Sequence, residues 1–147
     1  MKKFLSIMLT IVMCIAVTVP AFSANTTSSL QFGADGKFKI MQLNDTQDTV
    51  LTDIGEIMLI EAAIEQEQPD LLVFNGDQIT DTFPNADVDG LKKCVSNLFD
   101  VVNEKGIPFI VTFGNHDHDY EEIFTAAEQM AFYKQYSNCI VPDDVCD

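Results

Sequence analysis

A short stretch rich in histidine and carboxylate residues contains the closest grouping of possible metal ligands and proton donors in the sequence. The residues "FGNHDHD" (113–119) follow an apolar run, and they include both histidines of the chain, His116 and His118. Imidazole and carboxylate groups bind metals and carry protons near neutral pH. This stretch is therefore a candidate part of a metal or catalytic site.

Two other polar clusters occur in the same setting. "NDTQD" (44–48) follows the apolar run "FKIMQL", and "NGDQ" (75–78) follows "PDLLVF". Asp, Asn and Gly are also common in loops and at helix N-caps, so turn chemistry would explain any one cluster. Three clusters, each directly after an apolar run, favour a shared site.

The runs that precede these clusters read as β-strands separated by helices. Apolar residues recur at helical spacing between the runs, with Asp87 or Asp89 as an N-cap and Gly106 as a C-cap of the second helix. The order strand–helix–strand–helix–strand predicts an α/β fold with a parallel βαβαβ core. We expect strands at 38–44, 69–77 and 107–114 and helices at 53–68, 87–106 and 120–138.

Parallel strands bring their carboxyl ends to one edge of a sheet, where ligands bind. The three clusters would then meet there. Carboxylate and amide oxygens with an imidazole suit divalent Mg, Mn, Fe or Zn. Two such metals bridged by a carboxylate, about 3.5–4 Å apart, hydrolyse phosphoesters in other proteins. A metal-bound hydroxide would attack phosphorus, and an imidazole that binds no metal would protonate the leaving oxygen.

The segments "FKIMQLNDTQD", "PDLLVFNGDQIT" and "IPFIVTFGNHDHD" resemble, in this order, the first three motifs of the calcineurin-like metallophosphoesterase family. GNHD after a strand is the most specific of them. The resemblance implies an αββα sandwich with two divalent metal ions (Mn, Fe, Zn or Mg, with the identity open). It also implies a phosphorylated small molecule as substrate.

The metal ligands follow from the resemblance residue by residue. Asp45 is similar to the ligand of the first metal, Asp77 to the bridging carboxylate and Asn115 to the ligand of the second metal. The family's first motif is usually Asp-x-His, whereas this chain has Gln47 at the third position. An amide oxygen is a weaker ligand than imidazole, and the Gln variant resembles secreted bacterial members.

The same resemblance makes His116 the general acid and Asp117 the residue that orients its ring. The family completes its site with a later His and a Gly-His-x-His motif, but no histidine follows His118. The chain therefore resembles the N-terminal half of the sandwich, truncated at its C-terminus, with an incomplete site. Without the second sheet, the first would be exposed and would favour self-association.

The N-terminus predicts export. Met1-Lys2-Lys3 followed by an apolar run and small residues is typical of a signal peptide at 1–24. The run is shorter than the roughly 20 residues that span a bilayer, so we expect no stable membrane anchor. A flexible lead-in at 25–36 and a phosphoesterase domain at 37–147 would follow, in a secreted or extracytoplasmic protein.

The formal charge of −15 argues against nucleic acid as a partner, which needs clustered Lys and Arg. Two other interpretations stay open. One is an inactive fragment or pseudoenzyme with the fold alone. The other is an extracellular calcium-binding module, because "NADVDG" (85–90) matches the start of a calcium loop, although Ser96 replaces its final Glu. The pairing of Cys94, Cys139 and Cys146 is also open.

Overall fold

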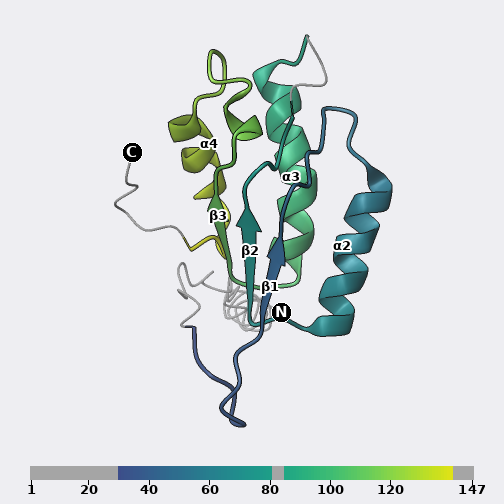
Figure 1. Cartoon of the computed structure of the whole chain (residues 1–147), viewed down its shortest axis with the longest axis vertical. Helices are drawn as coiled ribbons and strands as arrows, with labels where there is room; N and C mark the ends of the chain where they lie inside the picture. Colours follow the sequence, from purple (N-terminus) through teal and green to yellow (C-terminus); the bar gives the residue numbers. More distant parts are fainter. Residues whose placement is uncertain (1–29, 81–84, 141–147) are drawn as a thin grey trace, which may run out of the picture.

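The computed structural model describes residues 30–80 and 85–140 (Figure 1). The predicted signal peptide lies outside these residues, as do Cys146 and the first part of the predicted lead-in. Three strands, β1 (Ile40–Leu43), β2 (Leu71–Asn75) and β3 (Phe109–Thr112), form a parallel sheet in the order β1-β2-β3. The prediction of an α/β fold with a parallel βαβαβ core is confirmed.

Each connecting helix begins after an Asp N-cap. In α3 (Val88–Glu104) it is Asp87, one of the two predicted caps, whose carboxylate accepts a hydrogen bond from the first turn. In α2 (Ile54–Glu67) it is Asp53, for which no cap was predicted. Gly106 has φ +71° just after α3, a conformation that favours glycine and ends the helix. Because α3 begins at Val88, the stretch after Asp87 is helical and forms no calcium loop. The interpretation as a calcium-binding module is therefore wrong.

The last helix is much shorter than predicted. Instead of spanning 120–138, α4 covers only Ala126–Tyr133. Thr125 and Glu128 form a capping box that fixes its start. After the helix, the chain turns back to the sheet, where the backbone N of Ile140 donates to the carbonyl of Phe109 at 2.7 Å. This pairing with β3 competes with helix extension.

The core lies between the sheet and the helices. Phe74 of β2 and Phe109 of β3 contact the ring of Phe99 of α3, with ring centroids 4.7 and 5.0 Å apart. Tyr133 of α4 packs on the same ring at 5.0 Å. These four aromatic residues are 0–1% exposed. They join two strands and two helices into one closely packed core, which supports the loops at the strand ends.

The opposite face of the sheet is open only in part among the described residues, because Leu71 on that face is 7% exposed. Side chains alternate along a strand, and on this face Gln42, Asn75 and Thr112 are exposed. Ile40 is 57% exposed there. The outer side of α2 is also apolar and exposed, with Met58 and Leu59 at 64% and 69%. None of the described helices is long and apolar enough to cross a membrane.

Candidate functional site

The loops after β1 and β2 are joined by backbone hydrogen bonds. The amide of Gln47 donates to the carbonyl of Asp77 at 2.8 Å, and that of Asp48 donates to Gln78 at 3.0 Å. Asp45 donates to Gly76 at 3.3 Å. The residues predicted to bind the first metal therefore lie beside the predicted bridging carboxylate, at the carboxyl ends of neighbouring parallel strands.

The backbone of these loops adopts an uncommon conformation. Asp45, Gln47 and Asp77 have φ values of +52°, +42° and +57°, in the left-handed region. A residue with a Cβ atom rarely adopts this conformation, and such residues concentrate at functional sites. All three are predicted metal ligands, whereas Thr52 and Gln68, the other two described non-glycine residues with positive φ, are not.

Asp117 joins the loop after β3 to the loop after β2. Its side chain is 0% exposed. Its oxygens accept hydrogen bonds from the amides of Asp77 at 2.7 Å, Gln78 at 2.9 Å and Gly114 at 2.8 Å. Burial raises the pKa of this carboxyl group, and the backbone hydrogen bonds oppose that rise. Asp117 acts as a clamp between the two loops.

Two glycines allow this close approach. A Cβ at Gly76 would lie 2.7 Å from the backbone N of Gly114, and a Cβ at Gly114 would overlap the carboxylate of Asp77. The amide of His116 donates to Oδ1 of Asp77 at 2.8 Å. The sequence "GNHD" therefore packs directly against the predicted bridging carboxylate.

The ring of His116 pairs with Asp119, to which the family resemblance assigns no role. Its Nδ1 lies 2.7 Å from Oδ2 of Asp119. Asp117 was expected to orient this ring, but its oxygens bind backbone amides instead. The difference arises because His116–His118 forms a short 3-10 helix, η1, in which residues three apart share a side. The i, i+3 spacing of His and Asp was the pattern that would have identified Asp119.

The predicted ligands match the chemistry of a divalent metal. Asp45, Gln47 and Asn115 are exposed, and Asp77 is half-buried. Two carboxylates and two amide oxygens are hard donors of the kind that Mg²⁺ and Mn²⁺ prefer. Among residues 30–80 and 85–140, no three His, Cys, Asp or Glu side chains form a metal-binding group. The donors present therefore fit a partial ligand set completed by water, substrate or further ligands.

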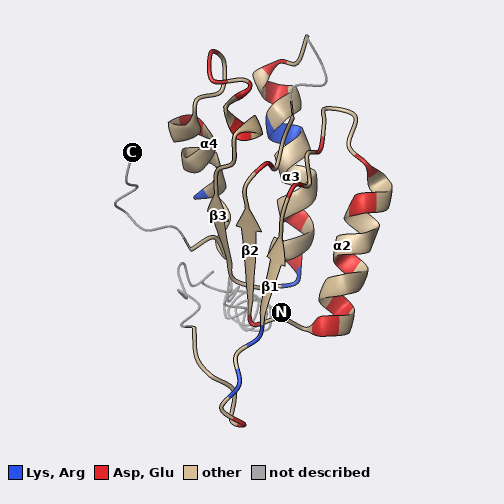
Figure 2. Cartoon of the chain, in the orientation of Figure 1, with Lys and Arg blue, Asp and Glu red and all other residues tan. Residues whose placement is uncertain are grey.

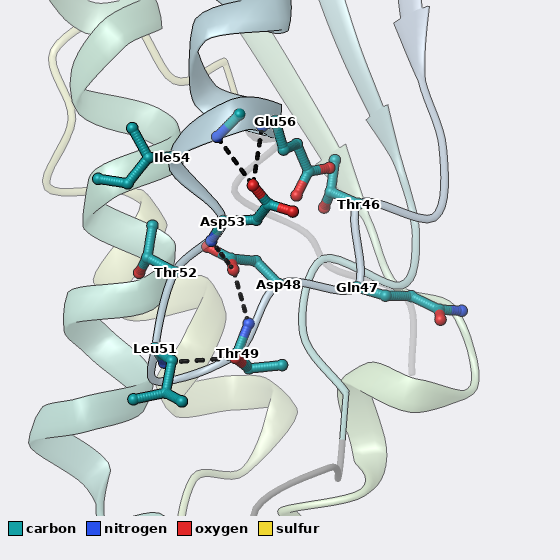
Figure 3. A pocket seen from close by; sticks show the side chains of 10 residues that line it. Thr46, Gln47, Asp48, Thr49, Leu51, Thr52, Asp53, Ile54 and Glu56 are labelled. Carbon is teal, nitrogen blue, oxygen red and sulfur yellow. Dashed lines mark hydrogen bonds between the residues drawn. The ribbon is translucent and has the colours of Figure 1, made fainter.

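A cavity of about 530 Å³ lies beside this edge and is lined by residues of the segment 46–56 (Figure 3). Asp48 is 4% exposed and accepts hydrogen bonds from the amides of Thr49 and Asp53. Burial raises the pKa of Glu56 to about 7, and the negative charges of Asp48 and Asp53 add to the rise. The cavity is therefore lined by three acidic side chains, those of Asp48, Asp53 and Glu56.

Acidic residues also occur in the loops that follow the strands (Figure 2). Lysine is sparse on the whole chain, which has eight Lys and Arg against 23 Asp and Glu. A phosphoryl group would be repelled by this charge unless bound cations reversed the local field. The two cysteines among the described residues, Cys94 and Cys139, are free thiols.

Comparison with known proteins identifies the family. The family model for calcineurin-like phosphoesterase matches residues 38–146. Three Arabidopsis thaliana proteins match, named "Probable inactive purple acid phosphatase" 14, 28 and 29. Their identities are 30%, 28% and 29%, over 61%, 78% and 69% of this chain.

The chain spans only 26%, 33% and 28% of the lengths of these relatives. No solved structure gave a significant match. The family match covers most of the chain, and its strands and loops have the order that the three motifs predict. The chain belongs to the calcineurin-like phosphoesterase family.

Proposed function

We propose that this chain takes part in the metal-dependent hydrolysis of a phosphorylated small molecule, outside the cytoplasm. The observation that carries the proposal is the hydrogen-bonded convergence of three loops. They bring Asp45 and Gln47, Asp77, and Asn115 with His116 to one edge of the sheet. Family membership supplies the reaction class.

Each predicted residue has a defined task in this proposal. Asp45, Gln47, Asp77 and Asn115 would supply ligands to the two divalent metals. The metals, when bound, would offset the charge of the phosphoryl group and activate water for attack on phosphorus. His116 would donate a proton to the leaving oxygen. Asp117 would fix the distance between the two loops that carry Asp77 and His116.

The assay uses the full chain with Mn²⁺ and two substrates, p-nitrophenyl phosphate and bis(p-nitrophenyl) phosphate. We expect turnover to stop on chelation and in His116→Ala. General acid catalysis contributes about 10²–10⁴-fold, so the loss should be of that size. His118→Ala is the matched control and should keep its activity. Turnover that survives in His116→Ala would contradict the proposed mechanism.

The second candidate is a family member that binds metal but does not hydrolyse phosphoesters. It is favoured by the names of the relatives, which describe them as "inactive". Calorimetric titration with Mn²⁺ separates the two candidates. Binding that Asp77→Asn weakens, without turnover of either substrate, would select this second function.

A further inference from the structure

The 3-10 helix η1 sets up a contact between the side chains of His116 and Asp119. The backbone amide of Asp119 donates to the carbonyl of His116 at 2.9 Å and closes the turn. In such a turn, residues three apart lie one above the other. Nδ1 of His116 and Oδ2 of Asp119 are consequently 2.7 Å apart, with the two side chains 36% and 24% exposed.

The other nearby acidic and imidazole groups have different contacts. Both oxygens of Asp117 accept backbone amides. The ring of His118 lies 3.2 Å from Glu121, again three residues away, with both side chains 50% exposed. The chain therefore contains two His–carboxylate pairs of the same spacing. The pair at His116 is shorter and less exposed, and it adjoins Asp77.

The chemistry of the pair determines which ring nitrogen carries the proton. An ionised carboxylate only accepts hydrogen bonds, so Nδ1 of His116 must be the donor. A neutral imidazole has a single N–H, and the hydrogen bond at one nitrogen decides the state of the other. With one proton held at Nδ1, a second proton binds at Nε2, and the imidazolium donates that Nε2 proton to the leaving oxygen and returns to the neutral Nδ1–H form.

We propose that Asp119 is the positioning residue of His116, which it holds in the Nδ1–H form with a fixed ring orientation. The role in proton transfer rests on the proposed phosphoesterase function, whereas the pairing itself does not. His116 is then fixed at two points. Its amide donates to Oδ1 of Asp77 at 2.8 Å, and its ring nitrogen Nδ1 lies 2.7 Å from Oδ2 of Asp119. A general acid gains efficiency when its position relative to the reacting centre is fixed in this way.

The test is ¹H–¹⁵N spectroscopy of the imidazole rings in the full, metal-free chain, at a pH where the rings are neutral. With only two histidines, each ring can be assigned from His116→Ala and His118→Ala. We expect His116 to show the Nδ1–H form. Asp119→Ala should shift it toward the Nε2–H form that free histidine prefers. Asp119→Asn keeps an acceptor oxygen and should restore the Nδ1–H form.

The matched control is Glu121→Ala, which should change the spectrum of His118 and leave that of His116 unaltered. An Nε2–H form of His116 in the unmodified chain would overturn the inference, as would an unchanged His116 spectrum in Asp119→Ala. Because these spectra need neither metal nor turnover, they decide the inference even if the unmodified chain hydrolyses nothing. If it does turn over substrate, Asp119→Ala should lower kcat while KM stays constant.

Discussion

At the scale of single residues, the loops of the site are held together by one buried carboxylate, that of Asp117. Asp117 accepts the amides of Asp77, Gln78 and Gly114, and its own carbonyl accepts the side-chain amide of Gln129 at 2.6 Å. A charge in a buried position is tolerated only when it is well hydrogen-bonded. The cost of burying Asp117 is thus offset by bonds that join the loops to each other and to α4.

Removing this clamp should destabilise the fold strongly. Asp117→Ala leaves several buried backbone amides without acceptors, and each such group costs about 1–3 kcal/mol. We expect the free energy of unfolding to fall by about 3 kcal/mol or more, measured by urea denaturation monitored by circular dichroism. Asp119→Ala, which removes an exposed carboxylate two residues later, is the control and should change stability by less than about 1 kcal/mol. If the two variants lowered the free energy of unfolding equally, Asp117 would not be the residue that holds the loops together.

Glu56 makes stability depend on pH. Its pKa is raised from 4.5 to about 7 by burial, with Asp48 and Asp53 adding to the rise. Between pH 4.5 and about pH 7, the folded chain binds more protons at Glu56 than the unfolded chain does. The contribution of this group to stability is therefore full below about pH 4.5 and is lost as the pH rises through about 7.

Glu56→Gln should flatten this dependence. We expect the variant to lose less stability than the unmodified chain when metal-free samples are denatured with urea at a series of pH values across that range. Glu104→Gln removes a charge from an exposed position and controls for the change in net charge. A pH profile of Glu56→Gln that runs parallel to that of the unmodified chain would show that Glu56 titrates as an ordinary exposed carboxyl group.

At the scale of elements, the regular parts of the fold were predictable from local patterns. Unbroken apolar runs marked β2 and β3, and helical spacing after Asp53 and Asp87 marked α2 and α3. The convergence of the loops followed because parallel strands have their carboxyl ends at one edge. These features depend on periodicity and capping, which a single sequence displays directly.

The irregular parts were not predictable in the same way. Helical spacing from Tyr120 onward suggested one long helix, but the capping box at Thr125 and the return of the chain to β3 shortened it. Whether His116 pairs with Asp117 or Asp119 depends on a single 3-10 turn. That turn is held by amides of a loop about 40 residues away in sequence, so the i, i+3 spacing of His116 and Asp119 identifies the pair only once the turn is known.

At the scale of the whole molecule, the sheet has helices and a core on one face only, within the part of the chain that the structure describes. The family resemblance implies a second sheet on the other face, whereas residues 30–80 and 85–140 contain one three-stranded sheet. Ile40 is 57% exposed on that open face, and β1 lies at the edge of the sheet. Unpaired edges and exposed apolar faces favour association with another chain.

We therefore expect the chain to self-associate through the open face, which sedimentation velocity over a range of concentrations would show. Burying one isoleucine contributes about 1.5–3 kcal/mol, and a lysine in its place would put a charge against an apolar surface. Ile40→Lys should then raise the dissociation constant at least about tenfold, since 1.4 kcal/mol corresponds to that factor.

Leu59→Lys is the matched control, because Leu59 is 69% exposed on α2, away from the sheet face. If Leu59→Lys dissociates the assembly and Ile40→Lys does not, the outer side of α2 is the contact surface instead. A chain that is monomeric at every concentration would contradict self-association through either surface.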